Sequence, residues 1–232
     1  MNMIFAVYKP KGPTSHDIIQ KVRKLTGIKK VGHAGTLDPL AQGILVIAIG
    51  RESTKKLSEI VAKEKEYLAT IKLGESSTTD DAEGGKTKSS IIEKPTKVRI
   101  QKVLQKFEGS IFQTPPIFSA VKIKGKEAYK LARKGKEVKL KPRKVEIKKI
   151  TLQSYQWPYL KLKIVTGPGV YIRSLARDLG RKLKTSGYLY SLERTRVGQF
   201  SKKKSVKFTG CTSSETYETF RPLGKSCKFI AN

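Results

Sequence analysis

The chain has 232 residues, of which 38% are apolar and 29% charged, so it is long enough to bury a core and too apolar to be disordered. The longest apolar run, 44–49, is too short to span a bilayer, and no basic leader precedes the apolar N-terminus, so we expect a cytoplasmic protein without a secretory signal. Lysine and arginine total 49 against 19 acidic residues, and a formal charge of +30 favours a polyanionic partner, most simply nucleic acid.

In the first third of the chain, apolar periodicity predicts three strands and two helices. The strands are expected at 3–8, 43–50 and 67–73, and the helices from 14 or 15 to about 25 and from 53 or 54 to 61. Gly27 would end the first helix as its C-cap. Leu57, Ile60 and Val61 would face inward on the second helix.

Residues 74–90 are rich in Gly, Ser, Thr and Asp, which predicts a long exposed loop. The later pattern predicts helices near 98–107, after Gly125 and over 171–183, and strands at 119–123, 145–152, 159–165 and 188–200. Strands outnumber helices, and most connectors are too short for parallel crossovers. The fold class is therefore α+β, with a mixed, mostly antiparallel central sheet flanked by helices. Beyond residue 201 the pattern weakens, and 202–204 and 209–219 resemble a loosely held tail.

Metal-binding and disulfide patterns are absent from the sequence. It holds two histidines and two cysteines, Cys211 and Cys227, without a C-x-x-C pair. We therefore expect no metal site and two reduced thiols.

The segment 31–45 concentrates the residues with chemical potential. It places His33 and one carboxylate, Asp38, among glycines between two apolar stretches. Gly32 and Gly35 allow positive φ or a close approach of a ligand, and Pro39 restricts Asp38 to an extended backbone. Composition alone is compatible with an ordinary Asp-Pro turn and with a loop that presents a catalytic carboxylate.

In full, however, this segment closely resembles the catalytic loop of the TruB-type tRNA pseudouridine synthases, G-H-x-G-T-L-D-P-x-A-x-G-x-L. The resemblance continues in order to about residue 200, and Val170 departs from it by replacing the usual threonine. The further motifs are K-P-x-G-x-T-S at 9–15, the strand tyrosine at 67, T-x-D-x-x-G at 79–84, P-P-x-x-S-A-x-K at 115–122, Y-I-R-S-L at 171–175 and L-x-R-T-x-V-G-x-F at 192–200.

The resemblance implies a pseudouridine-synthase-type catalytic domain that flips a uridine at position 55 of the tRNA T-loop out of its stack. Asp38 would be the nucleophile, toward either the sugar C1′ or the base C6. Arg173 would pair with Asp38 and keep it ionised, and Tyr67 would stack on the base and take its C5 proton. Residue type alone would instead make Arg173 an exposed charge or a phosphate contact, and Tyr67 a core residue.

Other residues are assigned to the substrate or its surroundings by the same resemblance. His33 would fill the space left by the extruded base, and Leu192 would line the base pocket, although core packing uses the same residue type. Lys9 and Pro10 would support the catalytic loop. Thr36 and Tyr171 complete the expected substrate-binding set.

The resemblance also shapes the expected partners and domains. Family members commonly add a C-terminal PUA-type RNA-binding module, whereas 32 residues, 201–232, follow the catalytic domain at 1–200 here. We expect no complete module, no cofactor, no membrane association, no obligatory protein partner, and a monomer that binds the tRNA T-arm. RNA affinity would then depend on basic residues, including those in 122–149. An RNA-guided synthase subunit and a non-catalytic RNA chaperone remain the alternatives.

Overall fold

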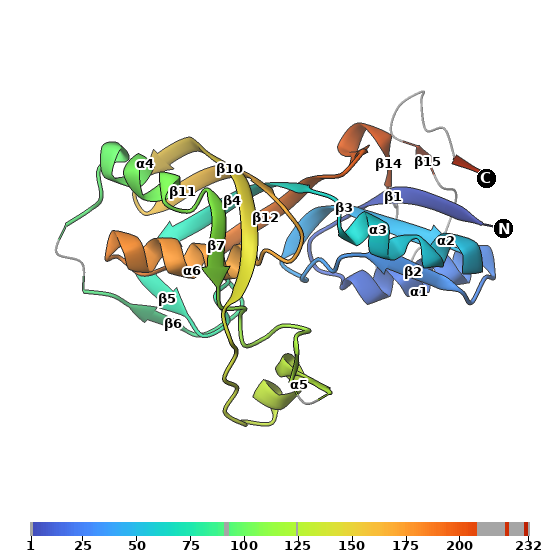
Figure 1. The fold of residues 1–232 in the computed structure, drawn as a ribbon, viewed down its shortest axis with the longest axis horizontal. Helices are drawn as coiled ribbons and strands as arrows, with labels where there is room; N and C mark the ends of the chain where they lie inside the picture. The colour runs from blue at the N-terminus through green and yellow to red at the C-terminus, as the bar shows by residue number, and fades with distance from the viewer. Residues whose placement is uncertain (1, 91–92, 124, 208–220, 223–229, 232) are drawn as a thin grey trace. The chain divides into compact units, whose positions relative to one another are not determined.

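The computed structural model of the chain describes residues 2–90, 93–123, 125–207, 221–222 and 230–231 (Figure 1). The chain divides into two compact units, the first formed by 1–67 and 192–232 and the second by 68–191. Two strands, β4 (Lys65–Leu73) and β12 (Gly187–Val197), contribute residues to both units. The strands that pair in each unit run mostly antiparallel, so the predicted α+β class with a mixed sheet and flanking helices is confirmed.

The sheet of the first unit is built around β1 (Met3–Lys9) and β3 (Ala41–Ile49), which run antiparallel. β12 pairs in parallel with β3 on one side, and β14 (Ser205–Lys207) pairs in parallel with β1 on the other. The remaining strands pair antiparallel with these: β2 (Val31–Ala34) with β3, β13 (Phe200–Ser201) with β12, β15 (Arg221–Pro222) with β14, and β16 (Ile230–Ala231) with β1.

The strand predicted at 43–50 is confirmed as β3, in which every side chain from Ile44 to Ile49 is at most 1% exposed. This strand lies inside the sheet and is covered on both faces, so its apolar residues run on without alternation. Ala6, Ala34, Ile44, Val46 and Val197 form a core cluster of this unit.

The described residues of the first unit include the α-helices α1 (Ser15–Thr26), α2 (Arg51–Lys55) and α3 (Leu57–Val61). Thr14 caps α1 in a reciprocal pair with Asp17, and Gly27 ends it with a φ of 69°, as predicted. The helix predicted from 53 or 54 is wrong in two respects. It begins at Arg51 and breaks into two short helices at Lys56, and Val61, at the helix end, is 39% exposed rather than inward.

The second unit contains a sheet in the order β4, β11 (Tyr159–Thr166), β10 (Arg143–Gln156) and β7 (Gly109–Gln113). The strands predicted at 145–152 and 159–165 are confirmed as β10 and β11, which pair antiparallel, and β7 pairs antiparallel with β10. Helix α4 (Lys97–Gln105) packs against β10 and against α6 (Ile172–Leu183). The helix predicted over 171–183 is confirmed as α6, which buries Ile172, Leu175, Ala176 and Leu179.

Several expectations for the chain beyond residue 73 were wrong in detail. The predicted loop at 74–90 contains a hairpin of β5 (Glu75–Ser77) and β6 (Lys86–Lys88). The strand predicted at 119–123 shrinks to β8 (Lys122–Ile123), and β7 was not predicted. The strand predicted at 188–200 is interrupted at Gly198, where a turn with a φ of 51° folds β13 back onto β12.

Between β7 and β10, the segment 114–142 projects away from the rest of its unit (Figure 1, green to yellow-green). It carries β8, β9 (Lys126–Glu127) and the short helix α5 (Ala128–Arg133). Of the predicted tail, 202–204 forms a single 3-10 turn before β14, and 209–219 lies outside the described residues. The domain boundary at residue 200 stays a prediction.

Candidate active site

Asp38 lies in the connection between β2 and β3, in the first unit. Its carbonyl accepts the backbone N–H of Ala41 at 3.1 Å, which closes a turn with Pro39 in the second position, where proline is favoured. Gly35 has the predicted positive φ, 81°, whereas at Gly32 a Cβ would lie 2.7 Å from the Leu57 side chain, which would have to shift. Asp38 is half-buried, and this hydrogen-bonded turn fixes its backbone.

The segment 9–15 holds this turn in place. The buried Ser15 hydroxyl accepts the N–H of Leu37 at 2.8 Å and donates to its carbonyl at 2.9 Å. The N–H of Gly12 donates to the carbonyl of Pro39 at 2.8 Å. The ammonium of Lys9, which is fully buried, donates to the carbonyls of Pro10 and Pro13 at 2.9 and 2.7 Å. Lys9 therefore shapes the segment that in turn supports the residues on either side of Asp38.

Arg194 is a buried cation to which the sequence analysis assigned no role. On β12, it is 2% exposed, and its Nε and Nη2 donate to the carbonyls of Ile44 and Gly35 at 2.7 and 2.9 Å. It also hydrogen-bonds the side chain of Tyr67. Burial lowers the pKa of the Arg194 guanidinium, whereas Tyr67 and Asp38 raise it. Arg194 thus joins the turn that carries Asp38, the buried strand β3 and the tyrosine of β4.

Tyr67 shares this environment. It is 6% exposed, and burial raises the pKa of its hydroxyl, with Asp38 adding to the rise and Arg194 opposing it. The first unit therefore brings three ionisable groups, Asp38, Tyr67 and Arg194, within electrostatic reach of one another. A carboxylate, a phenol and a fixed cation in partial burial can combine nucleophilic attack with proton transfer.

The remaining expected residues of the first unit lie around this cluster. His33 is on β2 opposite Ile47 of β3, and its pKa is lowered by burial, by Arg194 and by His16, so its imidazole is neutral at pH 7. Its buried Nδ1 has no hydrogen-bond partner within the described part of the chain. Leu192, 9% exposed, stands beside Ala41 in the β12–β3 register, and Thr36 is exposed.

Lys65 is a second buried cation that the sequence analysis did not single out. It is 6% exposed, and its ammonium donates to the carbonyls of Val61 and Lys63 at 2.6 and 2.7 Å. Burial, and then the charge of Arg194, lower the pKa of Lys65 to about 8. Lys65 caps the end of α3 beside the cluster.

Arg173 and Tyr171 belong to the second unit, at the start of α6. The Arg173 side chain is buried, so the interpretation of Arg173 as an exposed helix charge is wrong. Its guanidinium donates to the carbonyls of Phe118 and Thr79 at 2.9 and 3.4 Å and lies 3.6 Å from the Asp81 carboxylate. The backbone of Tyr171 is held by the Gln113 side chain, which accepts its N–H at 2.8 Å. Asp81 was placed in a motif but given no role. The predicted pairing of Arg173 with Asp38 stays a prediction.

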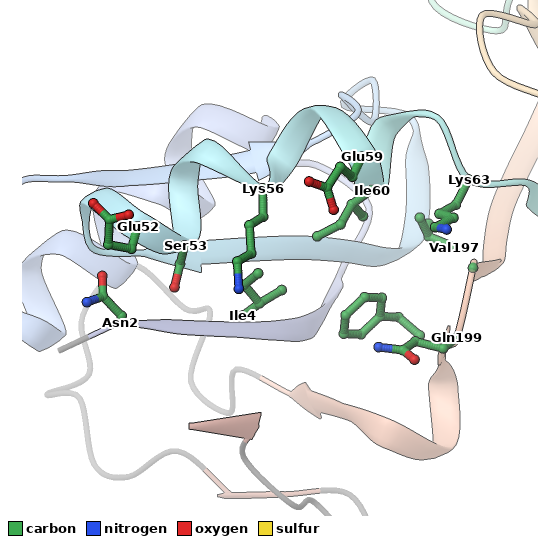
Figure 2. A pocket seen from close by; sticks show the side chains of 12 residues that line it. Asn2, Ile4, Glu52, Ser53, Lys56, Glu59, Ile60, Lys63, Val197 and Gln199 are labelled. Carbon is green, nitrogen blue, oxygen red and sulfur yellow. The ribbon is translucent and has the colours of Figure 1, made fainter. Parts of the chain in front are cut away.

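A pocket of about 620 Å³ lies elsewhere in the first unit (Figure 2). Figure 2 shows Ile4 of β1 opposite Glu59 and Ile60 of α3, and none of the predicted site residues lines the pocket. Over the described residues, His, Cys, Asp and Glu side chains form no group of three that could hold a metal ion. None of the helices in that part of the chain has the length and apolarity that a bilayer crossing needs. Cys211 and Cys227 lie outside it.

Comparison with protein families gives a match over residues 23–172 to the family described as "TruB family pseudouridylate synthase (N terminal domain)". The chain is similar to a protein of Clostridium tetani named tRNA pseudouridine synthase B, with 40% identity over 97% of this chain and 78% of that protein. A Parabacteroides distasonis protein of the same name is 42% identical over 91% of this chain and 90% of its own length.

Among solved structures, the chain resembles one titled "Crystal Structure of a Cbf5-Nop10-Gar1 Complex" with a TM-score of 0.69 and 26% identity. The match covers 88% of this chain and 52% of that one, so the chain spans about half of that solved protein.

A further sequence relative, a Wolbachia protein named tRNA pseudouridine synthase B, is 45% identical over 92% of this chain. The match covers 60% of that relative.

Proposed function

Because the chain belongs to the TruB family of pseudouridylate synthases, we propose that it isomerises uridine to pseudouridine in tRNA, at position 55 of the T-loop. The observation that carries the proposal is the cluster of Asp38, Tyr67 and Arg194 at the rigid turn of the family's catalytic motif. Relatives named for tRNA along most of this chain support tRNA as the substrate class. The position within the tRNA rests on the motif resemblance alone.

In the proposed reaction, the target uridine leaves its stack and enters the site, because its sugar and base edges are otherwise inaccessible. Asp38 attacks as the nucleophile, at either C1′ or C6, and the bond between C1′ and N1 breaks. The base turns, C5 bonds to C1′, the bond between the substrate and Asp38 breaks and restores the carboxylate, the proton leaves C5 and N1 gains one. Atoms and charge balance within the nucleoside, so this isomerisation consumes no co-reactant.

Tyr67 is the proposed acceptor of the C5 proton. A phenol with a raised pKa is a poor base until it loses its own proton, and burial drives its pKa upward. The hydrogen bond and charge of Arg194 act in the opposite direction and favour the phenolate. Arg194 thus supports Tyr67 as a base, while Leu192 and the ring of Tyr67 offer apolar surface to the flipped base.

Arg173 is the proposed partner of Asp38. Its guanidinium is the buried donor group that the family motif provides, and a carboxylate in a desolvated site needs such a cation to stay ionised. The contacts of Arg173 with Asp81, Thr79 and Phe118 support a fixed orientation for it within the second unit.

The T-arm of tRNA is the proposed partner, bound in large part by charge. The projecting segment 114–142 carries a high density of lysine and arginine, and phosphate contacts release counterions. His33, neutral and half-buried beside the catalytic turn, is the proposed residue that enters the space left by the base. We further propose a cytoplasmic monomer that works without an obligatory protein partner.

The proposal is tested by incubating an unmodified tRNA transcript with the protein alone and mapping pseudouridine. We expect one new pseudouridine, at position 55, and tritium release from C5-labelled uridine. Asp38→Asn should abolish the tritium release and retain folding and tRNA binding, because one carboxylate oxygen is replaced by an amide NH2 group of similar size. Release at the wild-type rate from Asp38→Asn would exclude the nucleophile, and a requirement for a guide RNA would favour the RNA-guided alternative.

A further inference from the structure

The guanidinium of Arg173 is held by two separate segments of the second unit. The loop 78–84 supplies the Asp81 carboxylate and the Thr79 carbonyl, and the segment 114–121 supplies the Phe118 carbonyl. None of these partners lies on α6 itself. The direction in which Arg173 points therefore depends on how firmly the two segments are attached to the helix.

Arg177, one turn further along α6, binds the same two segments. Its Nη1 lies 2.7 Å from the Asp80 carboxylate, and its Nη2 donates to the Thr114 carbonyl at 2.9 Å. Both charged side chains are largely buried, at 16% and 15% exposure, so water screens their attraction only weakly. Arg177 is further oriented by Asp178, whose carboxylate accepts from its Nε at 2.9 Å. Residues four apart on a helix share a face, so the two arginines form successive contacts with one pair of segments.

Asp80 sits in a backbone conformation that needs support. Its φ is 61°, in the left-handed region, which costs a non-glycine residue about 1 kcal/mol. Its carbonyl accepts the N–H of Leu189 at 3.0 Å, and its carboxylate meets Arg177. The next residue, Asp81, accepts the N–H of Glu83 at 3.0 Å and contacts Arg173. Two adjacent aspartates thus meet two arginines one turn apart.

We propose that the ion pair of Arg177 and Asp80 positions Arg173 for the reaction at Asp38, by fixing to α6 the two segments that hold the Arg173 guanidinium. Arg177 and Asp80 are positioning residues that act through Asp81, Thr79 and Phe118. The inference rests on the proposed function, in which Arg173 assists Asp38. It predicts a loss of catalytic rate rather than a loss of tRNA affinity.

Four variants and one control test this inference. Asp80→Asn removes the charge and keeps a residue that tolerates positive φ, Arg177→Gln removes the other charge, and the double variant removes both. Asp80→Glu keeps the charge as a rescue variant. Arg181→Gln is the matched control, because Arg181 lies on the same helix, is 71% exposed and lies 3.8 Å from the already paired Asp178. Two quantities are measured for each variant: the single-turnover rate of pseudouridine formation with saturating enzyme, and the dissociation constant for tRNA. The conditions are chosen so that every variant keeps the circular-dichroism signal of the folded protein.

We expect Asp80→Asn and Arg177→Gln each to slow the chemical step by roughly 10- to 100-fold, the scale of a misplaced catalytic group. The tRNA dissociation constant should change less than about twofold, because both altered side chains are largely buried and bind each other. The double variant should be no slower than Arg177→Gln, since the two charges act as one unit. Asp80→Glu should recover most of the rate, and Arg181→Gln should match the wild type.

Two results would overturn the inference. Wild-type rates in both single variants would show that Arg173 is oriented without the ion pair. Weakened tRNA binding in Arg177→Gln, with Asp80→Asn unaffected, would show that Arg177 contacts a phosphate instead. Failure of the proposed function looks different, because the wild type would then form no pseudouridine, or Asp38→Asn would stay active.

Discussion

Replacing Arg194 by methionine removes a buried cation while keeping most of the side-chain volume. Arg194 makes two hydrogen bonds to backbone carbonyls, those of Ile44 and Gly35, at 2.7 and 2.9 Å. A hydrogen bond to a charged group contributes about 1.5–3 kcal/mol, so the two bonds together contribute about 3–6 kcal/mol. Relief from burying the cation offsets part of this, and we expect a net loss of about 2–4 kcal/mol in the free energy of unfolding.

The measurement is urea unfolding of Arg194→Met, with Arg196→Met as the control on the same strand. Arg196 pairs with Glu64 at 2.7 Å but is 30% exposed, so its loss should destabilise by no more than about 1 kcal/mol. A fall in the unfolding midpoint at unchanged slope identifies a loss of stability rather than a change in the unfolded state. If Arg194→Met matched both Arg196→Met and the wild type within about 0.5 kcal/mol, desolvation would cancel the hydrogen bonds and the reasoning would be wrong.

Three further predictions concern the same site and its RNA. Tyr67→Phe should bind tRNA normally and lose about 10²- to 10⁴-fold in product formation and tritium release, the usual contribution of a proton-transfer group; normal yield would contradict a role for the hydroxyl. Because the folded protein depresses the pKa of Lys65 to about 8, the unfolded chain binds more protons between about pH 8 and 10.4. The free energy of unfolding should therefore rise over that range, by up to about 3 kcal/mol relative to Lys65→Met, and an equal pH dependence in both proteins would refute this. Binding of tRNA should weaken steeply with added salt, with a log–log slope of about −0.7 to −0.9 per phosphate contact, and a flat response would contradict binding by charge.

Much of the fold follows from interactions between residues close in sequence. The capping of α1 by Thr14 and its end at Gly27, the buried run of β3 and the apolar side of α6 all depend on patterns a few residues long. The strand β2 escaped prediction because its four residues are too few to show an alternation, and β7 because its partner β10 follows only after the segment 114–142. The hairpin inside 74–90 escaped it for another reason: its serine, threonine and lysine side chains carry no apolar alternation.

For the candidate site, the sequence alone showed the motif around Asp38 and the family to which the motif is similar. It also showed a glycine at position 35, where the backbone adopts a positive φ. It did not reveal the environment of Arg194, Arg177 or Asp81. The Ile44 carbonyl is 150 residues from Arg194, and Asp80 is 97 residues from Arg177. A buried cation is stable only where the folded chain brings acceptors to it, and acceptors so distant along the chain leave no periodicity, cap or spacing in the local sequence. The tertiary structure therefore decided which arginines are buried and which groups they bind, because only folding assembles those partners.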